Sequence, residues 1–158
     1  MARYFEEFQE NEVLLSLGRT ITEADVVNFA SLSGDWNEIH VNEEVARQEY
    51  YGRRIAHGAL IFCVSAGLIA QTDPSQKPNL IAFYGVERLR FVKPVFPGDT
   101  IRVKQTVASL EPRDQGSGFV NLAREVLNQD SNVVLAYTVR FLVRRRPAAE
   151  AAPANKDR

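Results

Sequence analysis

The segment Ala59–Ala70 constrains the fold most, because it is apolar on nearly every side of a helix and is interrupted only by one serine and one glycine. Such a helix must be buried on most of its faces. It is too short to span a bilayer. Gly58 opens the predicted helix, which runs to Gln71, and Pro74 follows its end. The sequence therefore predicts a domain built around one central helix.

The chain after this helix is rich in β-branched and aromatic residues, with turn residues between the apolar runs. This pattern predicts successive antiparallel strands. The four segments are Leu80–Val92, Thr100–Leu110, Phe119–Leu127 and Val133–Val143. One further strand is expected at Val13–Thr20, before the helices. Because strands and helices do not alternate, the order predicts an α+β fold whose sheet curls round the apolar helix.

Two shorter helices are expected before the central one. Thr22 is typical of an N-cap, and acidic residues follow it in the first turn. Gly34 is expected to end that helix. The segment Asp35–Val41 is then predicted to be a loop, and Asn42 to cap a short helix over Glu43–Glu49.

Length and composition indicate one soluble domain over residues 1–146, followed by a low-complexity tail, 147–158, that is expected to be disordered. The formal net charge of −1 gives no electrostatic attraction to nucleic acid or to an anionic membrane. The single cysteine, Cys63, lies in the apolar run and is expected to be buried. With no signal-like apolar segment at the N-terminus, a cytoplasmic location is expected.

The chain has two histidines, His40 and His57, and both lie in a short stretch between helices. Asp35 and His40 would point about 140° apart on a continuous helix. A loop after Gly34 would instead let both side chains face one cavity and hold one water for acid/base chemistry. On residue types alone, a turn-capping Asp35 and a packed His40 are the better interpretation.

Gly58 stands at the start of the central helix, where backbone N–H groups are unpaired and the helix dipole is positive. A glycine there lets a carbonyl oxygen approach the backbone closely, as in an oxyanion hole. The alternative is a glycine that serves only helix packing. His57 is expected to have a structural role. The sequence contains no cluster with metal-ligand spacing, no phosphate-binding glycine loop and no nucleophile elbow.

Three motifs, in order, resemble the MaoC-like (R)-specific enoyl-CoA hydratases. Ser33–His40 (SGDWNEIH) looks like the family's S-G-D-x-N-P-[LIV]-H, and Ala46 fits a following alanine. Ile55–Leu60 (IAHGAL) is similar to I-[AV]-H-G-M-L, and Arg90–Asp99 (RFVKPVFPGD) resembles R-F-x-x-P-V-x-x-G-D. Together they place the resemblance over most of the chain.

The resemblance implies a hot-dog fold, with an antiparallel sheet wrapped around a long central helix. It implies that Asp35 and His40 are the catalytic dyad and that the Gly58 amide binds the thioester carbonyl. Asn37 and His57 are assigned to the supporting loop. It implies no cofactor and no metal, a homodimer or a higher oligomer, and no nucleic-acid or membrane partner.

The expected activity is that of a hydro-lyase, which adds water to 2-enoyl-CoA or removes it from (R)-3-hydroxyacyl-CoA. Three alternatives stay open: a 3-hydroxyacyl dehydratase that acts on acyl carrier protein, a hot-dog acyl-CoA thioesterase, and a non-catalytic acyl-thioester-binding module. The sequence departs from the motif at Glu38, where proline is usual. A carboxylate there is expected to raise the pKa of His40. Tyr51 and Ala59 also depart from the common residues and are expected to affect the acyl pocket.

Overall fold

The computed structural model describes residues 2–72 and 77–147. Its main element is a six-stranded antiparallel sheet with the strand order β1-β4-β5-β6-β3, with β2 paired to β4 as well. The strands are β1 (Val13–Leu15), β2 (Arg19–Thr20), β3 (Leu80–Phe91), β4 (Thr100–Pro112), β5 (Ser117–Leu127) and β6 (Val133–Arg144). The long strands β3 to β6 agree closely with the four predicted segments.

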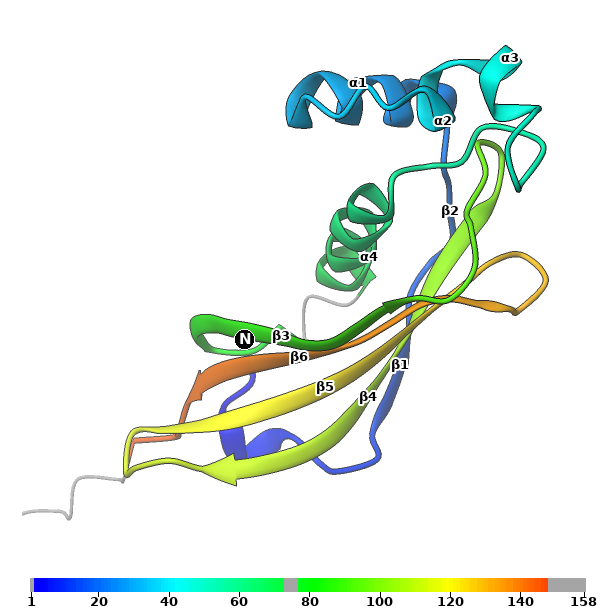
Figure 1. Cartoon of the computed structure of the whole chain (residues 1–158). Coiled ribbons are helices and arrows are strands. Elements are labelled where there is room, and N and C mark those ends of the chain that lie inside the picture. Colours follow the sequence, from blue (N-terminus) through cyan, green and yellow to red (C-terminus); the bar gives the residue numbers. More distant parts are fainter. Residues whose placement is uncertain (1, 73–76, 148–158) are drawn as a thin grey trace, which may run out of the picture.

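Helix α4 (Gly58–Thr72) lies in the hollow of the curved sheet (Figure 1). Its buried residues Leu60, Ile61, Val64 and Leu68 join a single core with the inward side chains of the strands. The predicted α+β class and the sheet wrapped round a central helix are confirmed. A short 3-10 helix, η1 (Phe5–Glu7), precedes β1.

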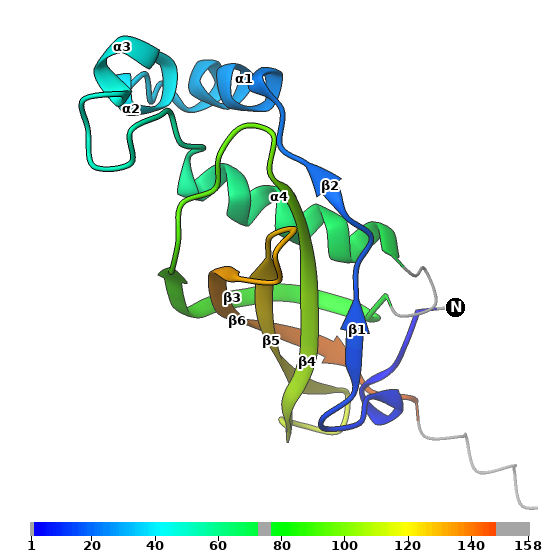
Figure 2. The ribbon, with the colours of Figure 1, turned by 90° about the vertical axis from the view of Figure 1, so that its right-hand side faces the viewer.

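Three shorter helices are grouped beyond the N-terminal end of α4, away from most of the sheet (Figures 1 and 2). They are α1 (Glu23–Ser33), α2 (Glu38–Val41) and α3 (Glu43–Ala46). Thr22 caps α1 as predicted, in a reciprocal capping box with Asp25. Gly34 ends α1 with a left-handed φ of 77°, a conformation that glycine adopts without a steric penalty.

Several expectations differ from the structure. The predicted strand Val13–Thr20 is two short strands, because Ser16 interrupts the ladder: its hydroxyl accepts a hydrogen bond from the Val103 N–H at 2.8 Å. Part of the predicted loop is the helix α2, which the Asn37 side chain caps. Cys63 is exposed rather than buried, because only one side of α4 packs on the sheet.

The predicted tail lies outside the described residues from position 148 onward. Among the helices that the structure describes, none is both long enough and apolar enough to cross a membrane.

Candidate active site

Asp35 and His40 come together because the chain turns sharply between α1 and α2. The Trp36 N–H donates to the Gly34 carbonyl, and the Asn37 N–H donates to Oδ1 of Asp35 at 3.2 Å. Oδ1 of Asn37 in turn accepts from the Ile39 N–H at the start of α2. These local bonds of Asp and Asn side chains to the backbone are typical of turns and caps. Asn37 therefore holds the loop, and α2 carries His40 back toward Asp35.

The tautomer of His40 follows from its hydrogen bond. Nδ1 lies 2.8 Å from the carbonyl oxygen of Ile55, and because a carbonyl can only accept, Nδ1 must carry the proton. In the neutral ring, Nε2 then keeps a free lone pair. Burial lowers the pKa of His40 below 6.5, and the nearby His57 lowers it further, against opposing effects of the Ile55 carbonyl and Asp35. The ring is thus held in a form that can accept a proton.

Glu38 does not raise the pKa of His40, contrary to the expectation from sequence. Its carboxylate accepts a hydrogen bond from the Asn42 side chain at 3.0 Å and is not among the causes of the His40 shift, whose net direction is downward. The side chain is exposed, so solvent screens its charge from the ring.

His57 is only 2% exposed and supports both members of the pair. Its Nε2 lies 2.9 Å from the main-chain carbonyl of Asp35, so Nε2 is the protonated nitrogen. Its ring stacks on His40 with 3.8 Å between the ring centroids, and the Phe29 ring packs against it at a tilt, with 5.1 Å between the centroids. Nδ1 of His57 is buried without a hydrogen-bond partner among the described residues. The side chain thus fixes the loop at Asp35 and one face of His40.

The carboxylate of Asp35 and one ring nitrogen of each histidine lie within 4.8 Å of one another. A water that makes two hydrogen bonds of about 2.8 Å bridges atoms roughly 4.5 Å apart, so the gap between Asp35 and His40 suits one shared water. The cluster suits a metal ion less well. Nδ1 of His40 and Nε2 of His57 already donate to backbone carbonyls. Because the two imidazole rings are stacked, the lone pairs of their other nitrogens point side by side rather than toward one shared ion.

A cavity of about 320 Å³ opens beside His40. Gly58 lies in its wall, at the first turn of α4, and its N–H has no hydrogen-bond partner among the described residues. A Cβ at position 58 would lie 2.7 Å from the ring of Phe91, so only glycine leaves this approach open. Tyr51 and Ala59, the two departures noted in the sequence, also line the cavity.

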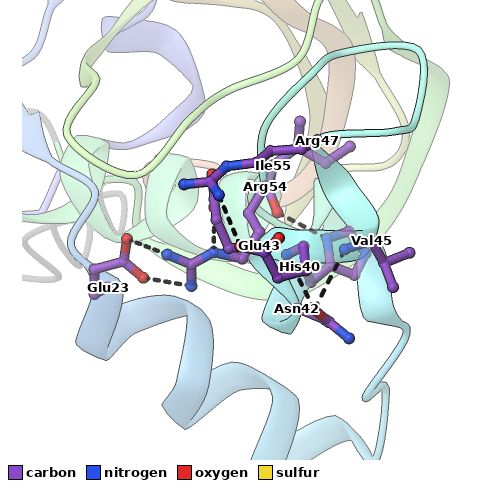
Figure 3. Close-up of polar contacts among 9 residues, drawn as sticks. Glu23, His40, Asn42, Glu43, Val45, Arg47, Arg54 and Ile55 are labelled. Atoms are coloured by element: carbon purple, nitrogen blue, oxygen red, sulfur yellow. Dashed lines mark hydrogen bonds and ion pairs between the residues drawn. The ribbon is translucent and has the colours of Figure 1, made fainter.

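An arginine clamp ties together the segments around His40. Nη1 and Nη2 of Arg54 each lie 2.9 Å from the Glu23 carboxylate in the first turn of α1. Nε of the same guanidinium lies 2.8 Å from Glu43 in α3. Figure 3 shows Arg54 between these two carboxylates, next to Ile55, whose carbonyl holds His40. The two-pronged pair with Glu23 fixes geometry as well as charge, and the hydrogen bond from Nε of Arg54 lowers the pKa of Glu43.

Sequence reasoning did not find Arg54, the Ile55 carbonyl or the cavity residue Phe91. Arg54 had no signal beyond its place next to the second motif. The Ile55 carbonyl is a backbone group, and such groups leave no trace in side-chain patterns. Phe91 belongs to the third motif, and its position in that motif was the one available indication that it lies near the site.

Comparisons with known proteins identify the family to which the chain belongs. The profile of the MaoC like domain family matches residues 5–142. The chain is 47% identical over 104 residues to protein MaoC of Klebsiella aerogenes, covering 66% of this chain and 30% of that protein. It is 41% identical over 109 residues to the (R)-specific enoyl-CoA hydratase of Rhodospirillum rubrum, covering 69% of this chain and 72% of that enzyme.

Solved structures show the same architecture. A monoamine oxidase regulatory protein from Archaeoglobus superposes with a TM-score of 0.88 at 36% identity, covering 92% of this chain and 97% of that one. The (R)-hydratase of Pseudomonas aeruginosa, in its unliganded form, gives 0.75 at 26% identity, covering 98% and 96%. A Mycobacterium tuberculosis protein with a double hot-dog fold gives 0.80 at 16% identity, covering 99% and 53%, a likeness of fold alone.

The curved sheet around α4 and the polar loop at the start of that helix define a hot-dog domain of the hydratase and dehydratase type. The chain belongs to the MaoC-like dehydratase family. The resemblance and the fold predicted from the sequence are thereby confirmed.

Proposed function

We propose that this protein adds water to the double bond of 2-enoyl-CoA, giving (R)-3-hydroxyacyl-CoA, and catalyses the reverse dehydration. One observation carries the proposal. The Ile55 carbonyl holds His40 as the Nδ1–H tautomer within 4.8 Å of the Asp35 carboxylate, and His40 and Gly58 line one cavity. These features support roles for His40 and Asp35 as the groups that hold the water and for the Gly58 N–H as the carbonyl site.

Asp35 and His40 would share the attacking water. As its oxygen bonds to the β-carbon, one of its protons passes to the dyad, and the electrons of the double bond move toward the thioester carbonyl. The Gly58 N–H stabilises the resulting enolate oxygen, an effect worth about 3 kcal/mol in comparable oxyanion holes. The dyad then delivers a proton to the α-carbon. Atoms balance, with one water consumed for each double bond.

The test is the loss of enoyl absorbance when purified protein is added to short, long and branched 2-enoyl-CoA thioesters. Asp35→Asn and His40→Gln should each lower the rate by about 10²- to 10⁴-fold. Glu38→Gln is the matched control, because that carboxylate lies in the same segment but, in the described part of the chain, bonds only Asn42, and it should keep near-normal activity. Full activity in either dyad variant would refute the proposal.

The same assay separates the alternatives. A preference for the acyl-carrier-protein thioester over the coenzyme A thioester would identify a dehydratase of fatty acid synthesis. Release of free thiol without loss of the double bond would identify a thioesterase. Binding of acyl-CoA without turnover would identify a non-catalytic module.

We also propose that the protein forms a homodimer through β3. This strand is at the edge of the sheet and exposes a row of large apolar side chains, and an open apolar edge is a template for pairing with another strand. The exposed residues are Leu80, Ile81, Phe83, Tyr84 and Phe91, and the exposed Val92 directly follows the strand. Because Phe91 also touches the space over Gly58, pairing there would complete the cavity wall. Light scattering on a sizing column should give twice the mass of the chain.

A further inference from the structure

The third sequence motif, Arg90–Asp99, lines the cavity at His40 with its residues 91–95 and then ends in a tight turn. The Phe96 N–H donates to Oδ2 of Asp99 at 2.9 Å, and the Asp99 N–H donates to the Phe96 carbonyl at 3.0 Å. Asp99 thus closes the turn with its side chain and its main chain, as aspartate often does. Its second carboxylate oxygen, Oδ1, accepts from Nε2 of Gln129 at 2.9 Å.

This turn is also bonded to two distant parts of the chain. The Gly98 N–H donates to the Ile21 carbonyl at 2.7 Å, and the Ile21 N–H donates to the Asp99 carbonyl at 2.8 Å. Ile21 is fully buried and directly precedes Thr22, the N-cap of α1. Gln129, the side-chain donor to Asp99, lies in the connection between β5 and β6. The turn is therefore fixed relative to both the sheet and the start of α1.

The residue before the turn connects it to the candidate active site. Val95 is only 4% exposed, and its carbonyl accepts a hydrogen bond from the Ala56 N–H at 2.8 Å. Ala56 belongs to the segment Ile55–Gly58, whose first carbonyl holds His40 and whose last residue lines the cavity. The neighbours of Ala56 in this segment bond to the loop Asp35–Val41, whereas the Val95 bond is an anchor outside that loop.

We propose that Asp99 is a positioning residue for the hydration. Its carboxylate fixes the turn that follows Val95, and the Val95 carbonyl in turn sets where the Gly58 N–H lies. This role rests on the proposed function. Without the carboxylate, the main-chain bonds of the turn remain, so the fold should persist while the carbonyl site shifts. A displacement of about 1 Å at such a group costs on the order of 10²-fold in rate. Because the site acts on charge that develops in the transition state, kcat should change more than KM.

The test compares hydration of a short enoyl-CoA by Asp99→Ala and by a matched control, Asp114→Ala. Asp114 also closes a turn, since its Oδ1 accepts from the Gly116 N–H at 2.8 Å and from the Ser117 hydroxyl at 3.0 Å. The two turns lie at opposite ends of β4, a strand of 13 residues. Both variants should lose similar amounts of thermal stability. Asp99→Ala should lower kcat roughly 10- to 100-fold with KM nearly unchanged, whereas Asp114→Ala should keep the wild-type kcat.

The conservative variant and a double variant show which group Asp99 acts through. Asp99→Asn keeps an acceptor for the Phe96 N–H, so it should recover most of the rate that Asp99→Ala loses. If Asp99 acts through Gly58, adding Asp99→Ala to Gly58→Ala should slow hydration by less than about tenfold beyond the slower single variant. Losses that multiply fully would contradict the proposal.

Nuclear magnetic resonance gives a readout that needs no turnover. The chain has nine glycines, so protein labelled with isotopic glycine gives a simple amide spectrum. The Gly58 amide signal should shift in Asp99→Ala and stay in place in Asp114→Ala, in which the Gly116 signal should shift instead. If the wild type hydrates no enoyl-CoA, the proposed function fails, and the Gly58 signal still decides whether Asp99 positions this backbone. An unmoved Gly58 signal in Asp99→Ala would overturn the proposal, as would a wild-type kcat in that variant.

Discussion

Replacing His57 by leucine should separate the stability of the protein from its activity. The substitution removes the 2.9 Å hydrogen bond to the Asp35 carbonyl, worth about 1 kcal/mol, and the ring stacking on His40, worth about 0.5–1.5 kcal/mol. It also removes the buried Nδ1 that has no partner among the described residues, which relieves about 1–3 kcal/mol. These effects nearly cancel, so the free energy of unfolding should stay within about 1 kcal/mol of the wild type.

Activity should fall in the same variant, because the main chain at Asp35 loses its anchor. A displacement of about 1 Å at a reacting group costs on the order of 10²-fold in rate. The variant His57→Gln keeps a donor for the Asp35 carbonyl, and it should therefore recover much of the rate lost in His57→Leu. Hydration of an enoyl-CoA and urea unfolding of the same preparations measure the two quantities.

The pH profile adds a third readout from the same proteins. His57 is one of the causes that lower the pKa of His40, so its removal should move the acidic limb of kcat/KM to higher pH. A His57→Leu protein that unfolds more than 3 kcal/mol more easily, with kcat and pH profile unchanged, would refute the positioning role.

Three further outcomes follow from the site. Gly58→Ala places a methyl group against the Phe91 ring and the carbonyl approach, so kcat should fall by up to about 10²-fold with little change in far-ultraviolet circular dichroism. Arg54→Met breaks the clamp on two helices and should lower kcat roughly tenfold, whereas Arg47→Met on the exposed side should not; equal rates would contradict the clamp. Because the folded pKa of His40 lies below 6.5, the unfolded chain takes up the proton first as the pH falls. Stability should therefore hold above about pH 6.5 and decline below it. The hydration rate should decline only at the lower pH at which His40 takes up a proton in the folded protein, and a rate that rises on acidification would contradict the role of His40 as a base.

Much of the fold was predictable because local signals and burial agree. One backbone conformation is specified at each of three places: the apolar run that forms α4, the N-cap of α1 at Thr22, and the end of α1 at Gly34. The strands β3 to β6 combine β-branched runs with clear turn residues. Cys63 was predicted wrongly, since the period of α4 shows that the helix is apolar but not which side the sheet leaves open.

The proximity of the candidate site residues was predictable, and their electrostatics less so. The motifs pointed to Asp35, His40 and Gly58, and the structure brings these residues to one end of α4. The direction of the His40 pKa depended on burial and on the stacked His57, which no local pattern encodes. Arg54 acts on segments far away in the sequence, so its role could be found only once those segments had been placed.

The most direct test of the dyad is a double-mutant comparison of hydration rates on one short enoyl-CoA. If Asp35 and His40 act on the same water, Asp35→Asn and His40→Gln should each cost about 10²- to 10⁴-fold. The double variant should then be slower than the slower of the two single variants by no more than about tenfold, because the effects of groups that act as a unit are not additive. A single variant with wild-type rates, or losses that multiply fully in the double variant, would contradict a shared water.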